Sequence, residues 1–373
     1  MNHLLLTNIL LSYLKFFNIM KTISFLSLFL LSLYVSAQNS PEDILLKDYR
    51  PESIYNTPVT TIEKAAYPVI DMHSHPYGES EEDLDRWVEY MDAAGIQKSI
   101  IMTMAYGEEF DSLIQAYSKY KDRFDLWCGF DYTGYDDSGF PENAIKELDR
   151  CHKAGAKGVG ELGDKGKGLF YCKPSAWGMH SDDDRMVPLF SKCAELNLPV
   201  NIHIAEPKWM YEKMDETNDG LMNAFEWRLD NKEGIVNHEG LMVILENTLR
   251  KNPNTTFIAC HLANCCYDLS IVGGMLDKYP KFYIDIGARF GEFSPIPKTA
   301  KAFFIKYQDR IVYGTDMGID LDMYRTTFRI LETADEHFYD HDRFGYHWPL
   351  YGLDLPDEVL EKVYNRNVSI LQQ

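Results

Sequence analysis

The sequence lacks several features that would place it in a common functional class. Lys and Arg are scarce, 37 against 57 Asp and Glu. This balance argues against nucleic acid as a partner, because binding a phosphate backbone needs clustered cationic side chains. No low-complexity tract and no repeat of solenoid period occurs. No glycine-rich phosphate turn follows the first predicted strand, which argues against a nucleotide-binding doubly wound sheet. These absences are consistent with a globular protein, and they do not identify its ligand.

Cysteine pairing is also missing. The seven cysteines form no C-x-x-C pair, and their odd number does not fit a complete disulfide framework. Most of them lie in apolar segments. We therefore expect small buried side chains rather than bridges.

The N-terminal region predicts export. The stretch from Met20 has a lysine, an apolar core and small residues before Gln38, which is the pattern of a secretory signal peptide cleaved after Ala37. Its apolar core is short for a membrane span. Because a second apolar stretch precedes this complete signal, we expect translation to start at Met20. We assign residues 1–37 to the signal and 38–67 to an N-terminal extension, and we expect the mature protein to be secreted or periplasmic, without membrane attachment.

From residue 68 onward, short β-rich runs alternate with amphipathic helical stretches. The first helical stretch begins after Ser80, which with Asp83 resembles a capping box, and stops at Gly95. Eight such units in about 260 residues are what a (β/α)₈ barrel requires. Residues 68–373 are therefore predicted to form an α/β TIM barrel, with a doubly wound open sheet as the alternative. The predicted strands are Val69–His73, Ser99–Met104, Leu126–Phe130, Gly158–Glu161, Val200–His203, Thr256–Cys260, Phe282–Ile286 and Ile311–Gly314.

Two insertions interrupt the alternation, Asp164–Asp184 after strand four and Glu206–Asn237 after strand five. Both lie on the strand-to-helix side, where a barrel carries its active site. Their aromatic side chains either line a substrate cleft or pack the insertions against each other.

Polar side chains follow the predicted strands at the ends that meet in the barrel mouth. Side chains alternate along a strand, so His73 and His75 point the same way, as does Asp71. Alone, these residues are either part of a metal site or a turn whose polar groups meet water. The ends of strands four, five, six and eight add Glu161, His203, His261 and Asp316. Four histidines and two carboxylates at one barrel mouth predict a metal site.

The order H-x-H, Glu, His, His and Asp at strands one, four, five, six and eight resembles the amidohydrolase superfamily. The segments VIDMHSH, NIHIAEP, IACHLAN and IVYGTDMG are similar to its amidohydrolase-related branch, the amidohydrolase 2 group, as is the ending LPDEVLEKVYNRNVSIL. That branch also includes enzymes like aminocarboxymuconate-semialdehyde decarboxylase. The resemblance covers the chain from Asp48 to its C-terminus. It is specific for the fold and the metal site and leaves the reaction open, since the branch hydrolyses some substrates and decarboxylates others.

The resemblance implies a set of ligands for one or two divalent metal ions, with zinc as the expected metal: His73, His75, His203 and Asp316. It implies that His261 touches the metal-bound water or the substrate, or binds a second metal. At strand four, relatives carry either a carbamylated lysine or a glutamate that bridges two metals. Glu161 takes that place here, as a bridging ligand or as a buried structural carboxylate.

The ligands imply a mechanism with metal-activated water. Asp316 would take the proton from the water and pass it to the leaving group, and His261 would stabilise the oxyanion, so these two are the predicted catalytic residues. Beyond strand seven, Arg289 is a candidate for binding a substrate carboxylate or a pair of sugar hydroxyls. The alternative for Arg289 is a salt bridge to Glu292 or another acid.

We therefore expect an exported metal-dependent hydrolase of a small polar substrate, an ester, lactone or amide, including carbohydrate-derived ones. The alternative is a metal-dependent decarboxylase, that is, a carboxy-lyase of the same branch. A binding protein without turnover is less well supported, because every expected polar position is filled. The expected partner is a small molecule, and the sequence leaves a homo-oligomer open.

Overall fold

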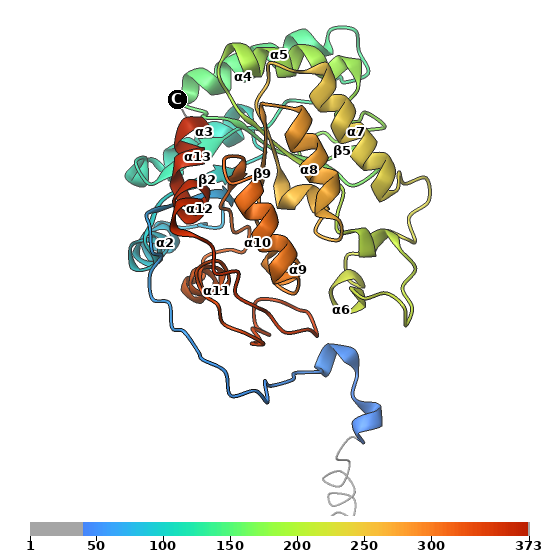
Figure 1. Cartoon of the computed structure of the whole chain (residues 1–373). Helices are drawn as coiled ribbons and strands as arrows, with labels where there is room; N and C mark the ends of the chain where they lie inside the picture. Colours follow the sequence, from blue (N-terminus) through green and yellow to red (C-terminus); the bar gives the residue numbers. More distant parts are fainter. Residues whose placement is uncertain (1–39, 372–373) are drawn as a thin grey trace, which may run out of the picture. The chain divides into compact units, whose positions relative to one another are not determined.

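A computed structural model of the protein describes residues 40–371 (Figure 1). The predicted signal peptide and start at Met20 lie outside these residues. Within the described range, no helix combines the length and the apolar character needed to cross a membrane.

The chain divides into two units at Arg50. The described part of the first unit contains two short 3₁₀ helices, Pro41–Asp43 and Leu46–Asp48. The second unit, from Pro51 onward, contains the candidate site, and the description below concerns this unit.

The second unit contains eight parallel strands in a (β/α)₈ barrel, as predicted. Their ends differ from the predicted ends by a few residues. Seven are buried along their whole length, or nearly so, because helices cover one face and the barrel interior the other. The strands are β1 (Val69–Ser74), β2 (Ile96–Met102), β3 (Phe124–Trp127), β4 (Val159–Asp164), β7 (Val200–Ile204), β8 (Phe257–Ala259), β9 (Phe282–Asp285) and β10 (Ile311–Val312).

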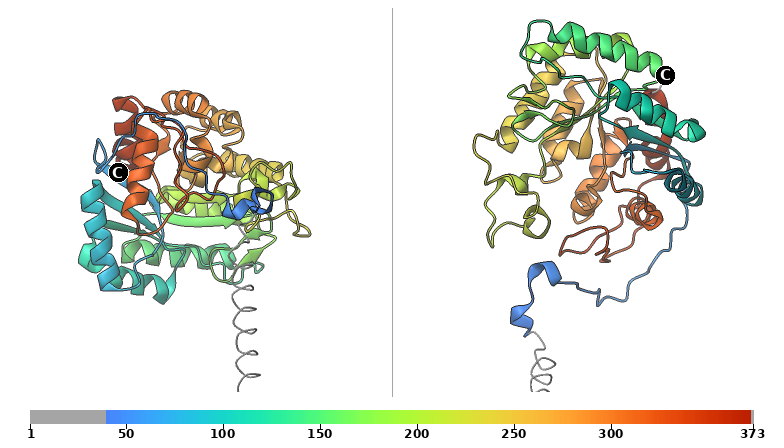
Figure 2. Two further views of the ribbon diagram at one scale, coloured as in Figure 1. Left: turned by 90° about the horizontal axis from the view of Figure 1, so that it is seen from below. Right: turned by 180° about the vertical axis from the view of Figure 1, so that it is seen from behind.

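One helix of nine residues or more follows each strand, and the views from three sides show the helices arranged outside the strands (Figures 1 and 2). The eight helices are α2 (Glu81–Ala94), α3 (Gly107–Ala116), α4 (Phe140–Ala154), α5 (Val187–Glu195), α7 (His238–Lys251), α8 (Leu269–Lys278), α10 (Pro297–Lys306) and α11 (Leu321–Glu332). The chain ends in α12 (Asp357–Glu361), a π-helical turn and α13 (Asn367–Leu371).

The strands pair in two runs, β1-β2-β3 and β10-β9-β8-β7-β4. Two sets of backbone contacts join the runs. Cys128 and Val159 form a parallel bridge between the β3 and β4 ends, and the Met72 amide donates to the Tyr313 carbonyl (2.9 Å) between β1 and the end of β10. The sheet therefore closes on itself, which excludes the open-sheet alternative.

The local sequence explains how α2 is positioned. The Ser80 side chain accepts a hydrogen bond from the Asp83 amide (3.2 Å), and Gly95 ends the helix with a left-handed φ of 87°. Leu84, Trp87 and Met91 recur at helical spacing and are buried. The N-cap at Ser80 and the stop at Gly95 are thus both present as predicted from the sequence.

Both insertions contain short elements of their own. Residues 164–184 carry the antiparallel pair β5 (Gly168–Leu169) and β6 (Ala176–Trp177). Residues 206–237 carry a 3₁₀ turn and α6 (Leu221–Ala224). All seven cysteines are free and buried, as expected from the sequence.

Candidate metal centre

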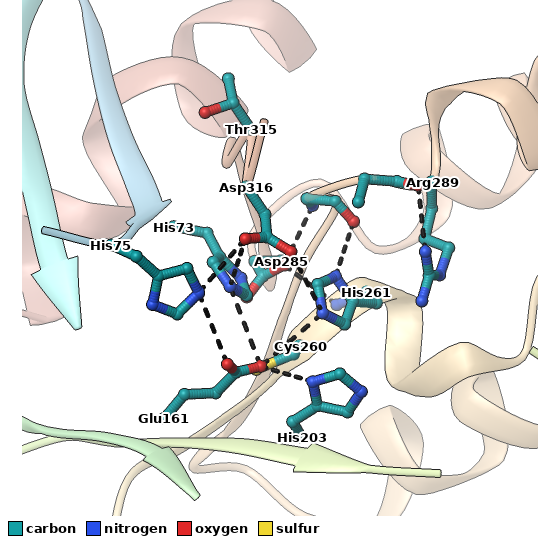
Figure 3. Close-up of polar contacts among 12 residues, drawn as sticks. His73, His75, Glu161, His203, Cys260, His261, Asp285, Arg289, Thr315 and Asp316 are labelled. Carbon is teal, nitrogen blue, oxygen red and sulfur yellow. Dashed lines mark hydrogen bonds and ion pairs between the residues drawn. The ribbon is translucent and has the colours of Figure 1, made fainter. Parts of the chain in front are cut away.

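The predicted ligands come together at the carboxyl ends of the strands (Figure 3). The close-up shows the imidazoles of His73, His75, His203 and His261 around the carboxylates of Glu161 and Asp316. Each ligand is carried by a different strand end, apart from the two histidines at the end of β1. The predicted site residues are His73, His75, Glu161, His203, His261 and Asp316.

His73, His75 and Asp316 form the first group that could hold a cation, with ligand atoms within 4.8 Å of one another. The Asp316 Oδ1 atom lies 3.2 Å from His75 Nε2 and 3.8 Å from His73 Nε2. The Tyr77 hydroxyl donates to the same Oδ1 atom (3.0 Å). Two imidazoles and one carboxylate at this spacing are a donor set for a divalent metal ion.

Glu161 lies at the centre of the second group. Its Oε1 atom is 3.9 Å from His73 Nε2 and 3.7 Å from His261 Nε2, and its Oε2 atom is 3.5 Å from His75 Nε2. The group also contains the Cys260 thiol, which we had not predicted as a ligand. Because Glu161 faces members of both groups, it occupies the place that a bridging carboxylate would need.

His203 is attached to the site through Glu161. Its Nδ1 atom lies 2.5 Å from Glu161 Oε1, and its Nε2 atom lies 3.5 Å from Glu206 Oε1. It belongs to neither group of mutually close ligand atoms. The structure therefore places His203 beside the centre, with Nδ1 as the nitrogen that faces it.

Three of the four histidines form a hydrogen bond through Nδ1 to a group outside the centre, so that Nε2 faces the centre. The acceptors are the Asp285 carboxylate for His73 (3.0 Å), the Met102 carbonyl for His75 (3.0 Å) and the Gly287 carbonyl for His261 (2.7 Å). A carbonyl or carboxylate at Nδ1 places the proton there and leaves Nε2 as a lone pair. This is the arrangement expected of histidines that bind a metal.

One buried nitrogen supports the same conclusion. His73 Nε2, which faces the centre, has no hydrogen-bond partner within residues 40–371. A buried polar atom without a partner is costly, and a metal ion or its ligands would remove that cost. The residues present therefore fit a divalent cation.

Asp285 and Asp71 support the site without entering it. Asp285 Oδ1 accepts from the His261 and Gly287 amides (3.0 Å each), in addition to the contact of Oδ2 with His73. Asp71, which alternation placed on the face of His73, instead accepts from the Thr315 amide (3.0 Å) and hydroxyl (2.6 Å). That expectation was wrong, because an irregularity in the β1–β2 pairing between residues 71 and 74 breaks the two-residue period. Asp71 thus fixes the turn that carries Asp316.

Backbone strain is concentrated at the barrel mouth. Four consecutive residues from His261 to Asn264 have left-handed φ between 52° and 61°, and Ala205, Ala288 and Asp316 are also left-handed. None of them is glycine, so each of these conformations costs free energy. Such strain is typical of functional sites, where the surrounding structure enforces it.

The carboxylates of the site favour positive charge. Burial works against a charged imidazole, yet Asp285, Asp316 and Glu161 raise the pKa of His73 to about 10, and Glu161 with Glu206 raises that of His203 to about 9. Burial also opposes ionisation of Glu161 and Asp316, but the neighbouring histidines lower both carboxyl pKa values. The site therefore stabilises cations, which include a metal ion. His261 is the exception: burial and Arg289 lower its pKa, so this imidazole stays neutral.

A cavity of about 330 Å³ opens over the centre. A larger cavity, about 510 Å³ beside Lys64 and Arg123, contains none of the candidate ligands. The smaller one has walls from the barrel, both insertions and the segment before α12. Its lining includes Lys165, Tyr171, His203, Glu206, His261, Arg289 and Asp316.

Arg289 makes the salt bridges that were the alternative for it, and its role in substrate binding stays a prediction. Its guanidinium lies 3.4 Å from Glu292 and 3.5 Å from Glu206, and it donates to the Asn264 side chain (2.6 Å). It also lines the cavity, as does Lys165, which pairs with Glu206. Among the aromatics of the insertions, Tyr171 and Trp227 line the cavity, while Trp209 packs against Trp348, outside both insertions.

Residues 70–367 match the sequence profile of a family described as amidohydrolase. No curated protein matches the chain. Solved structures of similar fold include an uncharacterised TIM-barrel protein from Bordetella bronchiseptica, 15% identical over 82% of this chain and 98% of that one, with a TM-score of 0.52. A 2,6-dihydroxybenzoate decarboxylase from Rhizobium has the same identity, coverage and TM-score. A dihydroxybenzoic acid decarboxylase from Polaromonas, solved with manganese and an inhibitor, is 17% identical over 82% and 96%, with a TM-score of 0.53.

Proposed function

Because the chain belongs to the amidohydrolase family, we propose that it is a metal-dependent enzyme that removes the carboxyl group of a small carboxylic acid. The observation that carries the proposal is the cavity over the candidate ligands, whose wall contains three cationic side chains, Lys165, Arg289 and Arg343. Cationic groups beside a metal centre suit an anionic substrate. Two solved proteins of similar fold are decarboxylases of hydroxylated benzoic acids, which supports this reaction over the hydrolysis expected from the sequence.

The metal would be held by the two groups described above, with Nδ1 of His203 at their edge. A bound divalent cation supplies Lewis acidity, which polarises a substrate oxygen. The Polaromonas protein contains manganese. For this chain we retain zinc as the proposal, because imidazole donors outnumber carboxylates in the site and imidazole suits zinc.

The residues of the chain account for substrate binding and proton transfer. Decarboxylation breaks the bond to the carboxyl carbon, releases carbon dioxide and leaves an electron pair on carbon, which must take up a proton. The ionised Asp316 carboxylate can take up a proton from solvent and pass it to this carbon, because its side chain is 22% exposed and lines the cavity. His261 Nε2, 3.7 Å from Asp316 Oδ2, can accept a hydrogen bond beside this path. Arg289 lines the same cavity and orients the substrate.

Hydrolysis of an ester, lactone or amide is the second candidate. The observation that favours it is the ionised Asp316 carboxylate beside the neutral His261. The same carboxylate can take a proton from water and return it to a leaving group.

A single activity screen on metal-reconstituted protein separates the two reactions. One panel contains hydroxybenzoates and unsaturated carboxylic acids, with carbon dioxide release as the readout, and the other contains lactones, esters and amides, with acid release as the readout. We expect turnover in the first panel, with chelator-treated protein as the control. Turnover in the second panel alone would replace decarboxylation with hydrolysis. Metal-loaded protein that is inactive in both would contradict the proposed function.

A further inference from the structure

The thiol of Cys260 is buried in the metal centre, and the proposed reaction does not use it. We propose that its sulfur is a ligand of the metal, and that it makes the centre prefer thiophilic divalent cations such as Zn²⁺ and Co²⁺ over Mn²⁺. This inference deepens the proposed function, since it rests on the same centre holding a cation. It does not depend on which reaction the enzyme performs.

The position of the sulfur carries the inference. The Cys260 sulfur, a Glu161 oxygen and ring nitrogens of His73 and His261 all lie within 4.8 Å of one another, and all four residues are buried. His73 Nε2 is fully buried and has no hydrogen-bond partner in the described part of the chain, so a polar atom that needs a partner points into the same group. Figure 3 shows the sulfur beside the Glu161 carboxylate.

The backbone explains how two consecutive residues can both face one site. Cys260 follows β8, where neighbouring side chains would normally point to opposite faces. His261 has φ 61° and ψ 41°, and this left-handed conformation continues to Asn264. The turn brings the His261 ring back to the side of the sheet that Cys260 faces. Because left-handed residues other than glycine cost free energy, the arrangement is one that the surrounding structure must enforce.

A chain of hydrogen bonds links the Cys260 sulfur to His73, a predicted metal ligand. The Cys260 thiol donates to Asn201 Oδ1 (2.6 Å), and Asn201 Nδ2 donates to Asp285 Oδ2 (3.1 Å). The same Asp285 oxygen contacts His73 Nδ1 (3.0 Å). Asn201 therefore orients the thiol and, through Asp285, the imidazole of His73. When sulfur binds a metal, the thiol proton leaves to solvent and this hydrogen bond to Asn201 is given up.

The chemistry of sulfur predicts the preference. A thiolate is a soft donor that selects zinc and similar ions, whereas manganese favours carboxylate and water oxygens. A coordinating thiol also loses its proton outright. Among the seven buried cysteines, Cys260 is the one whose sulfur belongs to a group of ligand atoms within residues 40–371.

Cobalt binding to the whole mature protein tests the inference without any substrate. A thiolate bound to Co²⁺ produces a near-ultraviolet charge-transfer band that nitrogen and oxygen ligands do not. We expect this band in the wild-type protein and its loss in Cys260→Ser. Cys265→Ser, a buried cysteine of the same turn outside the ligand group, is the matched control and should keep the band.

Competition measurements test the metal preference. In Cys260→Ser, affinity for Zn²⁺ should fall about 10-fold or more, whereas affinity for Mn²⁺ should change by less than about 3-fold. The wild-type spectrum needs no variant, so a folding defect in Cys260→Ser cannot hide the result. Cobalt bound without the band, or equal losses for both metals in a folded variant, would overturn the sulfur ligand and leave the proposed function intact. Wild-type protein that binds neither metal would overturn both.

Discussion

At the scale of single residues, the site depends on how each imidazole is held. His73 has Nδ1 against Asp285, and Nε2 is left free to face the centre. A second partner of this kind raises the basicity of the ligand and fixes its orientation. Residues that never touch the metal can therefore control how tightly it binds.

Asp285→Asn should weaken metal binding about 10- to 100-fold, the usual cost of losing such a partner. The Asp285 carboxylate only accepts hydrogen bonds, and the donors are His73, Asn201, His261 and Gly287. An asparagine would replace one accepting oxygen with an NH₂ group, which is itself a donor and would lose at least one of these bonds. Calorimetric titration with Zn²⁺ measures the change. Asp335→Asn, which alters a buried carboxylate bonded to Thr60 and Arg329, is the control. Equal affinities in the two variants would contradict the role of Asp285.

Asp316→Asn should lower kcat about 10²- to 10⁴-fold, the usual span for a general acid or base. The asparagine keeps the shape and can still accept from Tyr77, but it cannot carry a proton. Metal content, measured on the same sample, separates the loss of the proton carrier from the loss of the ion. A variant with full metal and wild-type kcat would rule out Asp316 as the proton carrier.

At the scale of elements, the two insertions and the segment before α12 build the cavity wall. Asn223 Nδ2 donates to the Tyr346 hydroxyl (2.8 Å), and that hydroxyl donates to Glu292 Oε1 (3.0 Å). The Tyr346 and Trp348 rings stack with centroids 4.4 Å apart. Segments far apart in the sequence thus meet over the mouth. These contacts connect them to Glu292, which lies 3.4 Å from the Arg289 guanidinium.

His180 holds the first insertion in a pH-dependent way. Its Nδ1 atom lies 2.6 Å from Asp164 Oδ2, while Asp164 Oδ1 accepts from the Gly166 and Gly168 amides. The hydrogen bond to Asp164 raises the pKa of His180 above its usual value. The contact therefore stabilises the fold fully below about pH 6.5, the ordinary value for histidine, and loses this effect as pH rises through the raised folded pKa.

His180→Gln should accordingly lower the free energy of unfolding more at about pH 5.5 than at about pH 9. Urea unfolding at both pH values measures the difference. His152→Gln, a histidine exchange in α4 remote from Asp164, is the control. A deficit that is the same at both pH values would show that His180 contributes by packing and not by charge.

At the scale of the whole molecule, the metal should link the strand ends to one another. Its ligands lie at or just after the ends of β1, β4, β8 and β10, so they come together only in the folded chain. Metal at 100 times its dissociation constant should stabilise the fold by about 2.7 kcal/mol. Thermal unfolding with Zn²⁺ and with excess chelator measures this. Identical midpoints would mean that no ion is held by the folded state.

Export also belongs to the molecule as a whole. We predict that the protein is secreted or periplasmic and that its mature chain begins at Gln38. Mass spectrometry of protein from the native host measures the N-terminus. A chain that begins at or near Met1 would contradict cleavage.

Much of the fold could be predicted because its signals are local. Runs of β-branched residues, helix caps such as Ser80 and stops such as Gly95 act over a few residues, so the alternation of eight strands and helices is readable along the chain. The ligand positions followed from the same pattern. In a barrel, every strand ends at one mouth, and polar residues at those ends must meet.

Only the tertiary structure decided which atoms meet, because pairings across a barrel leave no local trace. Asp71 left the predicted face through an irregularity between two strands, and Asp285 reached His73 across 212 positions of sequence. Cys260 looked like one small core residue among seven, and a left-handed turn at His261 placed the His261 ring on the side that the Cys260 sulfur faces. Side-chain alternation assumes regular backbone, and at the mouth of this barrel the backbone is strained by the packing around it.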